Sequence, residues 1–130
     1  MAIISSILPS SAALMKTTSI VPLLKWMGGK RQILPKIHEH LPKNINELRY
    51  YEPFLGGGAV LFDLQPKRAV ISDLNAELIN VYKVIKTNPE DLIDELYKHP
   101  FDKEYFYKLR AVDRTGELKN WNDIQKAARI

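Results

Sequence analysis

The chain has 130 residues, of which 45% are hydrophobic and 26% are charged, and its formal net charge is +4. This size and balance are typical of one globular domain with a buried core, and they disfavour a disordered chain, a collagen and a coiled coil. The absence of cysteine excludes a disulfide scaffold, an iron–sulfur cluster and a thiolate zinc site. The mild positive charge is compatible with an acidic partner such as nucleic acid but does not establish one.

The first twenty residues differ in composition from the rest of the chain. They are rich in Ser, Thr and Ala, carry the single charge of Lys16, and contain Pro9 within their apolar stretch, which is not the pattern of a secretory signal. No stretch approaches the roughly 18 apolar residues of a membrane span. We therefore predict a loosely ordered extension over 1–20, followed by a domain over 21–130.

From residue 30 the hydrophobic pattern becomes regular and predicts helices and strands in turn. In chain order we expect a helix over 33–41 that Pro42 ends, a strand over 49–52, a helix over 59–64, a strand over 69–72 and a helix over 75–87. The last of these carries an apolar stripe made of Leu78, Val81, Tyr82 and Ile85.

Three further helices are predicted toward the C-terminus. Asn88 is expected to cap a helix that has Pro89 at its first position and ends at His99. Asp102 opens the next helix, which carries Phe106, Leu109 and Val112 on its apolar face. The last helix is expected to begin at Asn120 and to run to Ile130 without a stop signal, which favours a piece of a longer protein or a frayed terminal helix.

A glycine-rich turn and a following acid give the first indication of function. The order strand, turn, helix, strand and acid is typical of the first half of a doubly wound α/β fold. Here the turn is EPFLGGG, from Glu52 to Gly58, and the acid is Asp73, whose distance along the chain from Glu52 is close to the expected value of about 20 residues. Glycines let a ligand approach the backbone, and such an acid accepts hydrogen bonds from ribose hydroxyls. The pattern predicts a ligand that contains a nucleoside.

The turn does not match either of the common phosphate-binding patterns. In the dinucleotide pattern G-x-G-x-x-G, counted from Gly56, the third glycine is replaced by Leu61, and no Gly-Lys pair follows the turn as in a phosphate-binding loop. S-adenosylmethionine is a nucleoside ligand without phosphate. Asp73 would bind its ribose, Lys30 its carboxylate and Glu52 its ammonium group, with Phe54 as a wall against the adenine.

Each of these assignments has a structural alternative. Lys30 and Glu52 could be solvated surface charges, Phe54 could belong to the core, and the three glycines could form only a flexible turn.

Three segments of the chain resemble one enzyme family. KWMGGK at 25–30, EPFLGGGAV at 52–60 and ISDLN at 71–75 are similar to motifs of Dam-type (class D12) adenine-N6 DNA methyltransferases, in the same order. The resemblance implies a Rossmann-like methyltransferase fold, S-adenosylmethionine as cofactor and duplex DNA as partner. From the residues themselves we expect no metal and no membrane, and we expect a cytoplasmic location. The resemblance places Trp26 and Lys30 in the cofactor pocket, Phe54, Gly56 and Gly58 in the loop around the cofactor, and Asp73 on the ribose.

One family motif is missing. The family's catalytic segment has the form [D/N/S]-P-P-[Y/F/W] and holds the flipped adenine, but no two of the eight prolines of this chain are adjacent. We therefore assign no catalytic residue and expect 21–130 to be the N-terminal, cofactor-binding part of such an enzyme, ending before its target-recognition and catalytic segments and inactive alone. The alternatives are a non-catalytic nucleoside-binding or DNA-associated fragment and, less in keeping with the turn, an NAD-dependent dehydrogenase domain.

Overall fold

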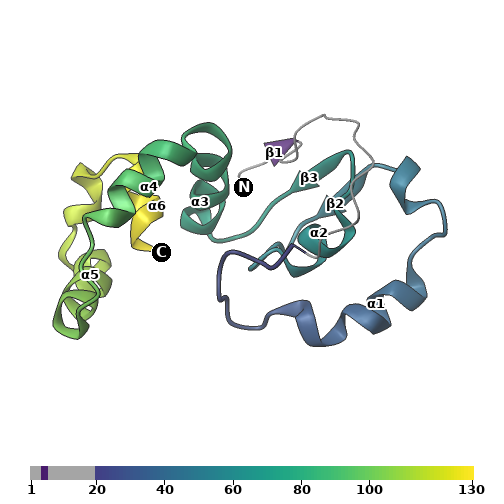
Figure 1. Ribbon diagram of the computed structural model, residues 1–130, viewed down its shortest axis with the longest axis horizontal. Helices are drawn as coiled ribbons and strands as arrows, with labels where there is room; N and C mark the ends of the chain where they lie inside the picture. The colour runs from purple at the N-terminus through teal and green to yellow at the C-terminus, as the bar shows by residue number, and fades with distance from the viewer. Residues whose placement is uncertain (1–3, 6–19) are drawn as a thin grey trace. The chain divides into compact units, whose positions relative to one another are not determined.

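A computed structural model describes residues 4–5 and 20–130. The chain divides into two compact units, Met1–Leu74 and Asn75–Ile130, with strands in the first and helices in both (Figure 1). The predicted extension over 1–20 lies outside the described residues, apart from 4–5 and Ile20.

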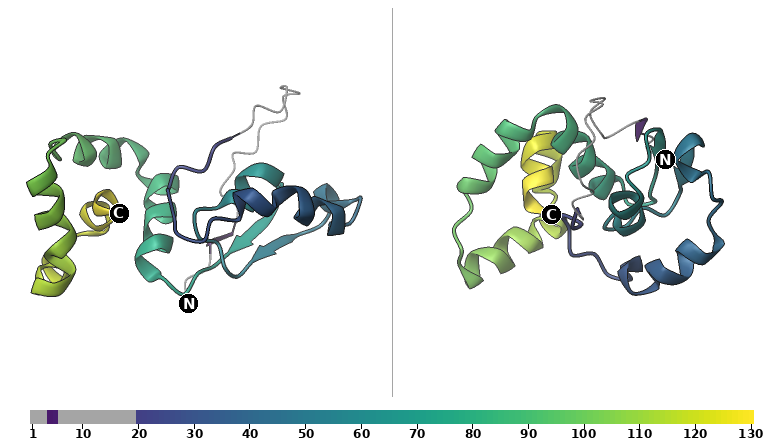
Figure 2. Two further views of the ribbon diagram at one scale, coloured as in Figure 1. Left: turned by 90° about the horizontal axis from the view of Figure 1, so that it is seen from below. Right: turned by 45° about the vertical axis from the view of Figure 1, so that its right-hand side comes forward.

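The first unit is built on a strand–helix–strand crossover. Strands β2 (Tyr50–Glu52) and β3 (Ala69–Ile71) are parallel, with Glu52 opposite Ile71. Helix α2 (Ala59–Leu64) connects them and lies against the strand pair (Figure 2). These three elements confirm the predicted ones to within one residue at each end. Because the strands are parallel, the segments that leave their carboxyl ends meet at one edge of the sheet.

A third strand was not predicted. Strand β1 (Ile4–Ser5) pairs antiparallel with β3, so that β3 is the central strand in the order β1-β3-β2. Two residues are too few to show the alternating pattern by which a strand is found in a sequence.

The core of the first unit lies between α2 and the strands. Its buried apolar side chains are Leu55, Ala59, Val60, Leu61, Phe62, Ala69 and Ile71. The predicted helix over 33–41 is present as a 3₁₀ turn (Lys30–Ile33) followed by α1 (Leu34–His40). Pro35 stands in the first turn of α1, where a missing N–H does no harm. A second 3₁₀ turn, Ile45–Glu47, precedes β2.

The second unit is helical. It contains α3 (Ala76–Thr87), α4 (Pro89–Tyr97), α5 (Lys103–Thr115), a 3₁₀ turn (Glu117–Asn120) and α6 (Asp123–Arg129). Helix α6 packs on α3 and α4, and its buried residues at the contact are the small Ala127 and Ala128. On the predicted stripe of α3 three of the four residues are buried, whereas Ile85 is only half-buried.

Two polar contacts join α3 to α6. Arg129 forms an ion pair of 2.5 Å with Glu77, and the Asn80 side chain donates a hydrogen bond of 2.7 Å to the carbonyl oxygen of Asp123. The side chain of Arg129 is 8% exposed, so its buried positive charge depends on this partner.

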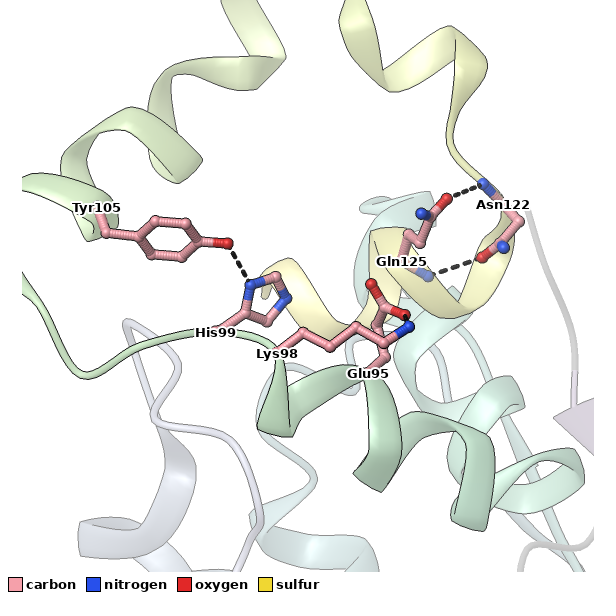
Figure 3. Close-up of polar contacts among 6 residues, drawn as sticks. All are labelled: Glu95, Lys98, His99, Tyr105, Asn122 and Gln125. Carbon is pink, nitrogen blue, oxygen red and sulfur yellow. Dashed lines mark hydrogen bonds and ion pairs between the residues drawn. The ribbon is translucent and has the colours of Figure 1, made fainter.

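The predicted start of α4 is confirmed, with Asn88 at the N-cap position and Pro89 first in the helix. The Asn88 side chain makes no cap hydrogen bond, because its amide oxygen accepts a hydrogen bond from the Thr87 hydroxyl and its amide nitrogen donates to Asp91. One predicted helix start is wrong. The last helix begins at Asp123 rather than Asn120, because Asn122 forms a capping box with Gln125 (Figure 3). The predicted cap of α5 is confirmed, since the Asp102 carboxylate accepts a hydrogen bond from the backbone N–H of Tyr105.

The apolar face predicted for α5 is confirmed only in part. Val112 is buried and Leu109 half-buried, but Phe106 is 55% exposed and lies off the packed face. At the start of the same helix, the Tyr105 hydroxyl lies 2.6 Å from His99 Nδ1 and ties the α4–α5 connection to α5 (Figure 3). None of the helices within 20–130 combines the length and apolar character of a membrane span.

Candidate functional site

A pocket of about 220 Å³ lies in the first unit at the carboxyl ends of β2 and β3. Three segments form it: the stretch Trp26–Lys30, the loop and helix start between β2 and α2, and Asp73 just beyond β3. Of the residues predicted from the sequence, five line the pocket: Trp26, Lys30, Phe54, Gly56 and Asp73. The parallel crossover thus brings together residues that are up to 47 positions apart in the chain.

The other two predicted residues, Glu52 and Gly58, do not line this pocket. Glu52 is 5% exposed and lies behind Lys30, with which it is paired. Gly58 is buried as the residue before α2 and has a left-handed φ of +73°. A side chain at Gly58 would therefore strain the backbone at the start of α2.

Lys30 is held at the pocket by two oxygen atoms. Its ammonium lies 2.7 Å from Glu52 Oε1 and also donates a hydrogen bond to the carbonyl oxygen of Phe54. The lysine side chain is 29% exposed and the glutamate side chain 6% exposed. Neither residue is a solvated surface charge, because a carboxylate this deeply buried needs a counter-ion.

The second oxygen of Glu52 stands apart from this pair. Oε2 is buried and receives no well-formed hydrogen bond from the part of the chain that the structure describes. Burial raises the pKa of Tyr50 well above its ordinary value, and the negative charge of Glu52 raises that pKa further. The carboxylate therefore has capacity to accept another donor.

Asp73 is joined to the glycine-rich loop. Its Oδ2 accepts a hydrogen bond of 2.9 Å from the backbone N–H of Gly56, which has a left-handed φ of +55°. A second link runs from the N–H of Leu55 to the carbonyl oxygen of Ser72 at 3.1 Å. These bonds hold the loop after β2 beside the segment after β3, so the pocket wall is fixed by the backbone of both.

Gly57 was not singled out from the sequence, and the structure gives it a specific role. A Cβ atom on Gly57 would lie 2.9 Å from the carbonyl oxygen of Leu24 and 3.4 Å from Trp26 Cβ. The middle glycine therefore lets the Leu24–Trp26 stretch approach the loop closely. The run of three glycines was the available signal, but a sequence does not show which chain segment packs against it.

The rim of the pocket is apolar and open to solvent. Phe54 is 74% exposed and Met27 is 96% exposed, so the alternative that Phe54 belongs to the core is wrong. Exposed apolar side chains beside a pocket are typical of a ligand-binding surface. No group of acidic or histidine side chains that could hold a metal ion occurs among residues 4–5 and 20–130.

Comparison with known proteins points to one family. The sequence profile of the D12 class N6 adenine-specific DNA methyltransferases matches residues 26–130. The chain is 48% identical over 111 residues to a type II methyltransferase, M1.LlaDCHI, of Lactococcus lactis subsp. cremoris, in a match covering 84% of this chain and 38% of the relative. It is 41% identical over 127 residues to the type II methyltransferase M.MjaIII of Methanocaldococcus jannaschii, covering 85% of this chain and 43% of the relative.

A DNA adenine methylase of Vibrio cholerae is 42% identical over 72 residues, which cover 55% of this chain and 25% of the relative. The chain thus spans less than half the length of each of these relatives.

Proposed function

Since the chain belongs to the D12 class N6 adenine-specific DNA methyltransferase family, we propose that it carries the S-adenosylmethionine site of an enzyme that methylates adenine N6 in duplex DNA. The observation that carries this proposal is the meeting of Asp73, the glycine-rich loop and the Lys30–Glu52 pair at one edge of the sheet. Duplex DNA as the partner follows from the family and from the names of the relatives, and it belongs to the proposal.

The residues present fit the proposed cofactor. Asp73 uses Oδ2 to hold the loop, and a carboxylate has enough lone pairs to accept ribose hydroxyls as well. Lys30 offers a positive charge at the pocket wall for a carboxylate, and Glu52, which lies outside the pocket lining, holds that lysine in place. Phe54 offers an exposed aromatic ring for the adenine.

The geometry also fits a Rossmann-like methyltransferase fold. In open α/β sheets the ligand site lies outside the carboxyl ends of the strands, and the parallel pair β2 and β3 has its pocket there. The three-stranded sheet with its crossover helix corresponds to the beginning of such a fold, so the Rossmann-like assignment is part of the proposal.

The part of the reaction that these residues serve is the placement of the methyl donor. When bound, S-adenosylmethionine supplies a methyl group made electrophilic by its positively charged sulfonium. Asp73 and Lys30, which both line the proposed site, would bind two polar ends of the ligand and restrict its orientation. Fixing a reacting group in this way lowers the barrier by removing the entropy cost of alignment.

The proposal is tested by binding. Isothermal titration calorimetry of the purified chain is expected to show binding of S-adenosylmethionine and none of NAD, because Leu61 occupies the place of the third glycine of the dinucleotide pattern and is buried. Binding of NAD with comparable affinity, or no binding of S-adenosylmethionine by a folded chain, would contradict the proposal. Folding is checked by circular dichroism in the same preparation.

A further inference from the structure

Met27 stands at the rim of the pocket and takes no part in the core. Its side chain is 96% exposed and lines the pocket together with Phe54, which is 74% exposed. Two exposed large apolar side chains at one pocket form a surface that a ligand covers when it binds. Methionine suits such a surface, because its unbranched side chain adapts to the shape that it contacts. A nucleoside ligand in this pocket would therefore take Met27 out of water.

The backbone on both sides of Met27 is fixed to the pocket. On one side Trp26 contacts the glycine-rich loop, since a Cβ atom on Gly56 would lie 3.6 Å from Trp26 Cδ1. On the other side the ammonium of Lys30 lies 2.7 Å from Glu52 Oε1. Met27 stands in a turn between these two attachments. The turn thus keeps the methionine side chain at the pocket, although that side chain is exposed.

The thioether of Met27 is open to oxidation. The chain has no cysteine, and its sulfur atoms are those of Met1, Met15 and Met27, of which Met27 lies within residues 4–5 and 20–130. A sulfur lone pair attacks one oxygen of hydrogen peroxide, the O–O bond breaks as an S–O bond forms, and the other oxygen leaves as water with both hydrogens. The sulfur is oxidised and the peroxide reduced. The product, a sulfoxide, is polar and chiral where the thioether was apolar.

We propose that Met27 is an oxidation site that controls the affinity of the pocket: a peroxide converts its thioether to the sulfoxide, and cofactor binding is weaker until the thioether is restored. The sulfoxide oxygen is a strong acceptor that must give up water when the ligand covers it. The ring of Phe54 on the same pocket offers that oxygen no hydrogen-bond donor. The inference rests on the proposed function, because it takes S-adenosylmethionine as the ligand that covers Met27.

The test compares wild type and Met27→Leu before and after treatment with hydrogen peroxide. The peroxide is removed with catalase, and S-adenosylmethionine binding is then measured by calorimetry. Met27→Leu keeps Met1 and Met15 and has a side chain of similar size that peroxide does not attack. The ratio of affinities before and after treatment is compared, so any change made by the leucine itself cancels. We expect the wild type to lose affinity by about tenfold and Met27→Leu to stay within about twofold.

Two further measurements connect the loss of affinity with the sulfur of Met27. Peptide mass spectrometry gives the fraction of Met27 that carries an added oxygen, and the loss of affinity is expected to follow that fraction. Methionine sulfoxide reductases of both stereospecificities, each of which reduces one epimer of the sulfoxide, are expected to restore binding. Circular dichroism of each sample shows whether the chain stays folded through the treatment.

Other outcomes overturn the inference in distinguishable ways. Complete oxidation of Met27 in a folded chain with unchanged affinity removes the inference, while the proposed function stands. An equal loss of affinity in wild type and Met27→Leu assigns the effect to another oxidised residue and also overturns it. A folded, untreated wild type that does not bind S-adenosylmethionine removes the proposed function and this inference with it.

Discussion

The backbone N–H of Gly56 donates a hydrogen bond of 2.9 Å to the carboxylate of Asp73, across 17 residues of chain. The loop after β2 and the acid after β3 are therefore one structural feature of the pocket. A substitution at Asp73 removes a proposed ligand contact and also releases the loop.

This double role predicts different results for two substitutions at Asp73. Asp73→Asn keeps an oxygen that can accept from Gly56 but loses the charge, whereas Asp73→Ala loses both. We expect Asp73→Ala to weaken S-adenosylmethionine binding by about 1.5–3 kcal/mol, the range for hydrogen bonds to a charged group, and Asp73→Asn to lose less. Calorimetry on the two variants decides this, and equal affinities for wild type and Asp73→Ala would remove Asp73 from the site.

A substitution at Gly57 is expected to disturb packing first and cofactor binding as a consequence. Gly57→Ala places a Cβ atom 2.9 Å from the carbonyl oxygen of Leu24, so the Leu24–Trp26 stretch must move away from the loop. We expect a loss of about 1–3 kcal/mol in the free energy of unfolding of the first unit, as for other overpacked sites, together with weaker cofactor binding. Urea unfolding followed by tryptophan fluorescence measures the first, because each unit contains one tryptophan, Trp26 or Trp121.

Gly116→Ala is the matched control for that variant. Gly116 lies in the second unit with a left-handed φ of +80° and no atom within 4 Å of the added Cβ. Gly116→Ala is expected to lower the free energy of unfolding by about 1 kcal/mol, which is the cost of backbone strain alone. It is expected to leave cofactor binding unchanged. If Gly57→Ala behaved in the same way, the close approach of Leu24 would be irrelevant to the pocket.

The ion pair between Glu77 and Arg129 is expected to stabilise the second unit. Glu77→Gln leaves the Arg129 side chain, which is 8% exposed, without its counter-charge. Because Glu77 itself is 39% exposed, solvent moderates the effect, and we expect a loss of about 1–2 kcal/mol rather than the larger value of a fully buried pair. Asp113→Asn, an exposed position on α5, is expected to stay within about 0.5 kcal/mol of wild type. Equal unfolding curves for Glu77→Gln and wild type would contradict a stabilising pair.

The raised pKa of Tyr50 predicts how stability depends on pH. Burial is its main cause, followed by Glu52. The folded chain then holds this proton more tightly than the unfolded chain, whose tyrosine ionises at about pH 10. The contribution to stability is complete below about pH 10 and decreases above it, by at most about 1.4 kcal/mol per pH unit.

Unfolding in urea between pH 8 and pH 11 measures this dependence. Above pH 10, wild type should lose stability more steeply than Tyr50→Phe, and Tyr51→Phe should follow wild type. Parallel curves for wild type and Tyr50→Phe would show that the Tyr50 hydroxyl is not perturbed.

The purified chain is predicted to transfer no methyl groups to DNA. The family resemblance leads us to expect that a Pro-Pro-aromatic segment grips the flipped adenine, and no adjacent prolines occur in these 130 residues. Labelled S-adenosylmethionine and adenine-containing duplex measure the transfer, with the Lactococcus lactis type II methyltransferase as the positive control. Turnover above background would place a catalytic group within this chain.

The sequence by itself determined the elements around the pocket and five of the residues that line it. Local patterns were sufficient to predict β2, α2 and β3. The alternation of apolar and polar residues, and the effects of glycine and proline on the backbone, depend on only a few neighbouring residues. The spacing of the glycine-rich turn and Asp73 was enough to predict that they meet, because parallel strands joined by one helix bring their carboxyl ends together.

Only the tertiary structure decided which groups touch across longer distances. That Glu52 lies behind Lys30, that Gly57 lies under the carbonyl oxygen of Leu24, and that Tyr50 is half-buried while Tyr51 is exposed all depend on how segments pack. The same holds for β1, whose partner β3 is 65 residues or more away, and for Phe106, which lies off the packed face of α5. Packing depends on which surfaces meet, and a pattern within one segment carries no information about the surface that it meets.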